Sequence, residues 1–134
     1  MIGNTDFSTA YQHNQKLLFK EGQMLPLPYD FDMSGLVDAS YAVVSNINNN
    51  PLNIAKVTQR QYRGFKRDIA SFEKVRQRFL QKQPELFKIL EQHQPLFKDK
   101  SSYRKAKEFI NSFFDIIKDD TQFDKNIVQA ARLK

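Results

Sequence analysis

An apolar repeat in the last third of the chain constrains the fold most strongly. Between residues 101 and 118, apolar side chains recur every three or four positions, as they do on one face of a helix: Ala106, Phe109, Ile110, Phe113, Ile116 and Ile117. Ser101 or Ser102 is suited to cap the start of this helix, and Asp119-Asp120 is expected to end it. Such a face needs a partner to bury it, so the sequence predicts a helical body.

The partner is expected in the preceding segment, where a second apolar stripe begins after Asp68. Asp68 is a suitable N-cap, and the stripe comprises Phe72, Val75, Phe79, Leu86 and Leu90. Pro84 lacks an amide hydrogen, so it should break or kink this helix into two pieces. With a last short helix over 123–133, residues 57–134 are predicted to form the helical body.

The first 39 residues carry turn formers and short apolar runs instead of a helical repeat. Residues 15–19 and 24–29 flank Gly22, which accommodates the positive φ of a tight turn, so we expect a β-hairpin. Pro26 and Pro28 mark its second strand as an edge. If the chain reverses about Gly22, paired positions sum to roughly 44, which places Asn14 opposite Asp30.

The predicted class is therefore α+β and mostly α, a short N-terminal hairpin followed by helices. An Asn-rich surface loop over 40–56 is expected to connect the two parts. At 134 residues, the chain is long enough for one compact core, and we expect residues 1–134 to form a single domain.

Composition narrows the function further. The chain has no cysteine and only two histidines, which argues against disulfides, thiolate sites and zinc. No apolar run is long enough to cross a bilayer and the first residues lack a signal peptide, so we expect a soluble protein, in a compartment that the sequence does not indicate. The net charge is +6, with basic residues concentrated over 56–107. This charge suits a phosphate-bearing partner, although a solvated helical surface explains it more simply.

Two carboxylates lie one residue apart at the end of the expected hairpin. Asp30 and Asp32 would share one face of a strand, and like charges this close are best tolerated beside a cation. The oxygen of Asn14 and the carboxylate of Asp6 are near enough to join them. A hard divalent ion, Mg²⁺ or Mn²⁺, is the first expectation. Capping of a turn by the two aspartates is an equally favoured alternative.

The order of these polar residues resembles that of a kinase catalytic core. Protein kinases place a catalytic Asp, a metal-binding Asn, a hairpin and a metal-binding Asp in succession. Here the sequence reads Asn4-Thr5-Asp6-Phe7-Ser8, then His13-Asn14, the hairpin, and Tyr29-Asp30-Phe31-Asp32. In this order the chain resembles atypical kinases of the HipA type and of the spore-coat CotH type. More narrowly, it resembles the C-terminal part of longer, uncharacterised bacterial proteins common in Bacteroidetes-type genomes.

The resemblance implies a bacterial protein whose helical body is a kinase-like C-lobe and whose full chain transfers phosphoryl groups. It implies that Asp6 is the catalytic base, that Asn14 is a metal ligand, and that Asp30 or Asp32 is the metal-binding Asp. The implied cofactors are Mg²⁺, with Mn²⁺ as an alternative, and ATP.

The chain as given begins where the catalytic loop of a kinase begins. It therefore lacks the Gly-rich loop, the strand Lys and the αC Glu that position ATP in kinases. We expect it to be inactive alone and to bind the missing N-terminal portion of its parent chain, or a second copy of itself. The runner-up function is a non-catalytic, helical protein-interaction module, and binding of nucleic acid is less favoured.

Overall fold

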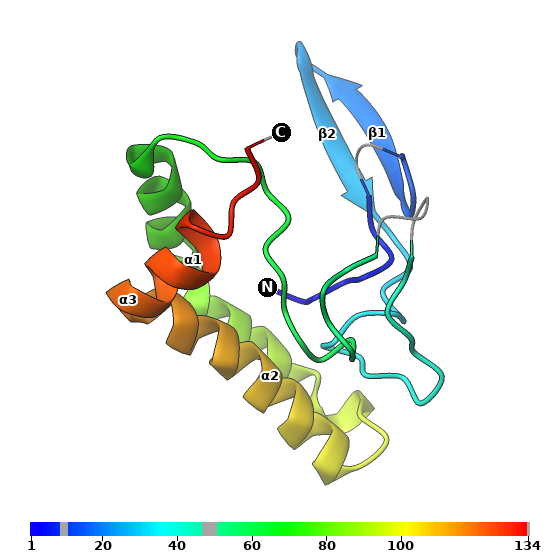
Figure 1. Cartoon of the computed structure of the whole chain (residues 1–134). Helices are drawn as coiled ribbons and strands as arrows, with labels where there is room; N and C mark the ends of the chain where they lie inside the picture. Colours follow the sequence, from blue (N-terminus) through cyan, green and yellow to red (C-terminus); the bar gives the residue numbers. More distant parts are fainter. Residues whose placement is uncertain (9–10, 47–50, 134) are drawn as a thin grey trace. The chain divides into compact units, whose positions relative to one another are not determined.

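The chain divides into two compact units in a computed structural model that describes residues 1–8, 11–46 and 51–133 (Figure 1). The first unit is Ile2–Gln61 and contains the hairpin, and the second is Tyr62–Lys134 and contains the helices. Over the described residues, helical conformations account for 43%, and strands together with isolated β-bridges account for 14%. The predicted α+β class with predominant helix is thus confirmed.

The first unit is built on the predicted antiparallel hairpin, drawn in blue in Figure 1. Strand β1 spans Gln15–Lys20 and strand β2 spans Gln23–Pro28. Glu21 and Gly22 form the loop between them and have φ angles of 51° and 74°. Two consecutive positive φ angles define a type I′ turn, whose twist matches that of the flanking strands.

The register of the hairpin differs from the prediction by one residue. Lys20 pairs with Gln23, and the Tyr29 amide donates a 3.0 Å hydrogen bond to the Asn14 carbonyl oxygen. Asn14 is therefore opposite Tyr29, and the prediction that it faces Asp30 was wrong. The chain reverses between the two residues of the loop and not on Gly22 itself, which shifts every pair by one position.

Residues 40–46 and 51–56 form neither helix nor strand, as expected for the connecting loop. The middle of the predicted Asn-rich segment, residues 47–50, lies outside the described residues.

The second unit begins with α1, which spans Ile69–Gln92. Its predicted N-cap is confirmed, since Asp68 Oδ1 accepts a 2.8 Å hydrogen bond from the Ser71 amide. Of the break or kink predicted at Pro84, the break was wrong, because α1 continues through the proline. Phe79 and Phe87, on either side of the proline, contact the same neighbouring helix, so packing holds both halves in one helix.

That neighbouring helix is α2, Lys100–Lys118, which lies beside α1 in Figure 1. Its end before Asp119 is as predicted. Its N-cap is Asp99 and not either serine, because Asp99 Oδ1 accepts a 2.7 Å hydrogen bond from the Ser102 amide. The rings of Phe79 and Phe113 lie 5.1 Å apart, and Phe114 is 0% exposed at the centre of the core. The repeat that predicted α2 is thus the face that packs on α1.

The chain ends differently from the single short helix expected over 123–133. A short helix, α3 (Asp120–Phe123), is followed by a π-helical turn, Asp124–Val128. Arg132 then pairs with the segment before α1, because its amide donates to Gly64 O at 3.0 Å and its carbonyl accepts from Lys66 N at 2.8 Å. A 3₁₀ turn, Gln94–Leu96, connects α1 to α2.

Candidate metal site at the open end of the hairpin

Asn4 connects the two polar loops at the open end of the hairpin. Its side-chain oxygen accepts a 2.9 Å hydrogen bond from the Asp6 amide, and its side-chain nitrogen donates to the Asp30 carbonyl oxygen at 3.2 Å. The Gly35 amide also donates to Gly3 O at 3.1 Å. The segment that carries Asp6 is therefore fixed beside the segment that carries Asp30 and Asp32.

Asp6 and Asn14 contact each other directly. The Asn14 side-chain nitrogen donates to Asp6 Oδ2 at 2.8 Å and to the Asp6 carbonyl oxygen at 2.9 Å. Ser45 Oγ donates to Asp6 Oδ1 at 2.5 Å, and His13 Nε2 lies 3.2 Å from Asp6 Oδ2. The Asn14 side-chain nitrogen donates to Asp6, so its side-chain oxygen is the atom that could bind a cation.

These contacts set the protonation state of Asp6. Partial burial acts to raise its pKa, but the hydrogen bonds from Ser45, His13 and Asn14 outweigh this effect and lower the pKa below its ordinary value. Asp6 is therefore ionised at neutral pH and is a weak proton acceptor.

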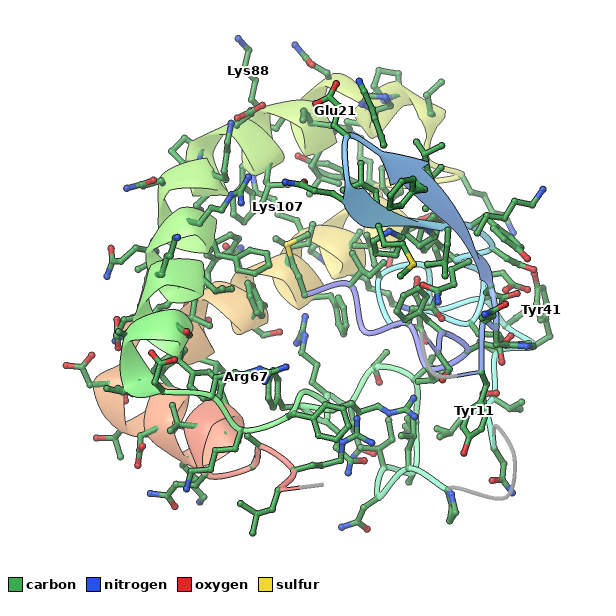
Figure 2. The ribbon with its side chains drawn as sticks, turned by 90° about the horizontal axis from the view of Figure 1, so that it is seen from above. Tyr11, Glu21, Tyr41, Arg67, Lys88 and Lys107 are labelled. Atoms are coloured by element: carbon green, nitrogen blue, oxygen red, sulfur yellow. The ribbon has the colours of Figure 1, made fainter. Side chains whose placement is uncertain are left out.

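The pair Asp30 and Asp32 has the opposite electrostatic character. A hydrogen bond with Asp32 and the negative charge of that residue raise the pKa of Asp30. Asp30 has a φ angle of 57°, a left-handed conformation that Asp tolerates better than most residues. The negative charge of Asp32 and a hydrogen bond with that residue also raise the pKa of Tyr41. In Figure 2, Glu21 marks the closed end of the hairpin and Tyr41 lies toward its opposite end.

The four predicted site residues thus form two interacting pairs. Asp6 contacts Asn14, Asp30 interacts with Asp32, and the charge of Asp6 makes a small contribution to the raised pKa of Asp30. The expected pairing of Asn14 with Asp30 is not formed.

The donor set consists of oxygen atoms and is small. Over the part of the chain that the structure describes, no group of three or more His, Cys, Asp or Glu side chains is arranged to hold a metal ion. Mg²⁺ commonly uses one or two protein carboxylates and takes its other ligands from phosphates and water, so a pair such as Asp30 and Asp32 suits it. The capping alternative also has a contact in its favour, since Asp32 Oδ1 accepts from the Met33 amide at 2.8 Å.

Sequence reasoning missed Ser45 and Tyr41, which contact the two halves of the site. Both follow the hairpin in a segment without helical or strand periodicity, and Ser45 is 39 residues from Asp6. No local pattern marks either residue.

No protein-family model matches the chain, and neither the curated proteins nor the solved structures contain a match. Among the described residues, no helix is both long enough and apolar enough to cross a membrane.

Proposed function

We propose that the hairpin unit supplies the divalent-cation side of a kinase-like phosphotransfer site, and that the helical unit corresponds to a kinase-like C-lobe. The observation that carries the proposal is the interacting carboxylate pair of Asp30 and Asp32, fixed through Asn4 beside the contact between Asp6 and Asn14. When bound, Mg²⁺ would offset the charge of nucleotide phosphates.

The residues of this proposal have separate roles. Asp30 and Asp32 hold the cation, with the side-chain oxygen of Asn14 as a further ligand. Asp6 orients the acceptor hydroxyl through a carboxylate oxygen. Its lowered pKa supports this role, because the carboxylate stays ionised and accepts a hydrogen bond, but is too weakly basic to be an effective general base. Ser45 and His13 fix the position of the Asp6 carboxylate.

We propose that catalysis also needs a segment that positions the phosphates. The hairpin unit has four basic residues against five acidic ones, so it is a poor phosphate site without a metal ion. A partner segment with basic residues would provide the positioning cation, and the chain alone would bind a Mg²⁺–nucleotide complex without turning it over.

Isothermal titration calorimetry of the whole chain with Mg²⁺ and ATP tests the proposal. We expect a binding heat that is lost in Asp30→Asn and Asp32→Asn. Asp38→Asn is the matched control, because Asp38 is exposed in the same unit and also has a positive φ angle, 47°. Equal heats in the wild type and all three variants would exclude this site.

A protein-interaction module remains the second candidate function. It is favoured by the apolar side chains exposed on both faces of the hairpin, of which Phe19, at 73% exposed, is the largest example. The two functions are compatible, because the polar site lies at the open end of the hairpin and the exposed apolar residues lie along its strands.

A further inference from the structure

The hydrogen-bonding pattern of the hairpin leaves its two outer edges unequal. In an antiparallel pair, residues that bond across the ladder alternate with residues whose backbone groups point outward. Lys20 pairs with Gln23 next to the two-residue loop, and the Tyr29 amide bonds to Asn14, which fixes the alternation. Leu17 and Phe19 of β1 therefore direct their backbone groups outward, as do Pro26 and Pro28 of β2.

The outer edge of β2 is closed to further pairing. At Pro26 and Pro28 the backbone has no N–H group at the positions that would donate to another strand. A strand added beside β2 would lose those two hydrogen bonds.

The segment just before β1 already accepts an antiparallel partner on the same edge. His13 N donates to Ser8 O at 2.9 Å, and Ser8 N donates to His13 O at 3.2 Å. Within the described part of the chain, no backbone hydrogen bond is present on this edge at Leu17 and Phe19. Both side chains are also exposed, at 42% and 73%. An edge strand with exposed apolar side chains at two successive outward-directed positions favours strand addition.

We infer that two copies of this chain pair through β1, antiparallel, and form a four-stranded sheet with β2 at each outer edge. Two antiparallel registers that join the outward backbone groups pair five residues of each β1, and the charges of β1 decide between them. If Leu17 faced Phe19 of the second copy, Lys16 would face Lys20, and like charges opposite each other are destabilising. If Leu17 faces Leu17, then Lys16 faces Leu18, and no two charges of the same sign oppose each other.

The same arrangement covers apolar surface and ends with two copies. Leu17 and Phe19 share one face of β1, so pairing brings four apolar side chains together on that face. An isolated two-stranded hairpin is only marginally stable, whereas a sheet of three or more strands with an apolar face can be stable on its own. The prolines at both new outer edges prevent a third copy from adding.

Disulfide trapping tests the register directly, because the chain has no cysteine of its own. In the inferred dimer, the two copies of Leu17 are directly opposite, with Cα atoms about 5.5 Å apart, a distance that a disulfide spans. We expect Leu17→Cys to form a covalent dimer under mild oxidation. Leu27→Cys is the control, since Leu27 is similarly exposed, at 50%, but lies on β2, whose outer edge cannot pair with another strand. Equal trapping of the two variants, or none in Leu17→Cys, would overturn the inference.

Sedimentation equilibrium provides a second, non-covalent test. We expect the mass to rise with concentration from 15.8 kDa to twice that value and no further. Leu17→Lys should weaken the dimer by about tenfold or more, because it places two lysines face to face, and Leu27→Lys should change it less than about threefold. A monomer up to about millimolar concentration, assemblies larger than a dimer, or equal effects of the two substitutions would each contradict the inference. Neither test depends on nucleotide or metal binding.

Discussion

Arg76 offers the clearest test of how the helical unit is held together. Its side chain lies on α1, is 9% exposed, and donates to Ile117 O at 2.6 Å and to Lys118 O at 3.2 Å, both at the end of α2. Its guanidinium carbon also lies 4.5 Å from the centre of the Phe123 ring. One side chain thus connects α1 to the end of α2 and to α3, and it satisfies carbonyl groups that a helix end leaves without partners.

We expect Arg76→Met to lower the free energy of unfolding by about 3–4 kcal/mol. Each of the two hydrogen bonds from the Arg76 guanidinium to the carbonyl groups of α2 contributes about 1.5–3 kcal/mol. The contact with the Phe123 ring adds about 0.5–2 kcal/mol. The ion pair with Asp120 adds at most about 1 kcal/mol, because Asp120 is 91% exposed. Methionine retains much of the packing, which keeps the total near the lower end of this sum.

Urea unfolding followed by far-UV circular dichroism measures this loss, since the helices lie in the second unit. Arg78→Met is the matched control on the same helix, because Arg78 is exposed, and it should change stability by less than about 0.5 kcal/mol. A loss below about 1 kcal/mol in Arg76→Met would refute the argument. Full rescue by Arg76→Lys would do so too, since an ammonium group lacks the planar fork that reaches several acceptors together.

Three further predictions concern individual side chains. Asp32→Asn should lower the pKa of Asp30, as measured by an NMR titration. A raised pKa in the folded state destabilises the fold once the pH exceeds the pKa, so without Mg²⁺ the variant should be more stable than the wild type at pH 7. An unchanged pKa of Asp30 would contradict this prediction. Ser45→Ala should raise the lowered pKa of Asp6, so its stability deficit should be largest at neutral pH and vanish as pH falls through that pKa; a deficit independent of pH would count against it. Gly64→Ala should lower the thermal midpoint, because the added Cβ would lie 2.1 Å from the hydroxyl oxygen of Tyr62, whose ring packs against Phe72 with ring centres 6.1 Å apart; an unchanged midpoint would contradict this.

Local chemistry allowed the main elements to be predicted from the sequence. Gly22 between two apolar runs was sufficient to predict the hairpin, and the spacing of Phe109, Ile110 and Phe113 predicted α2, since both signals depend on neighbouring residues. Pro84 shows the limit of such reasoning. Its local cost is real, but contacts of Phe79 and Phe87 with α2 keep the helix continuous, and no local pattern contains that information.

The residues of the candidate site were proposed from the sequence, and their pairings came only from the structure. Asp6, Asn14, Asp30 and Asp32 were each identified from residue type and order. Their partners depend on a one-residue difference in the register of the hairpin and on long-range contacts such as that of Ser45 with Asp6. A turn that contains Gly is compatible with loops of more than one length, so the register of the hairpin could be determined only from the structure.

Paramagnetic broadening by Mn²⁺ in a ¹⁵N NMR spectrum of the whole chain tests the proposed cation site most directly. We expect substoichiometric Mn²⁺ to broaden the amide signals of Asp30 and Asp32 first, then those of Asp6 and Asn14, and excess Mg²⁺ to restore them. Broadening that is spread over the acidic residues of the helical unit, or that spares Asp30 and Asp32, would contradict the proposed cation site.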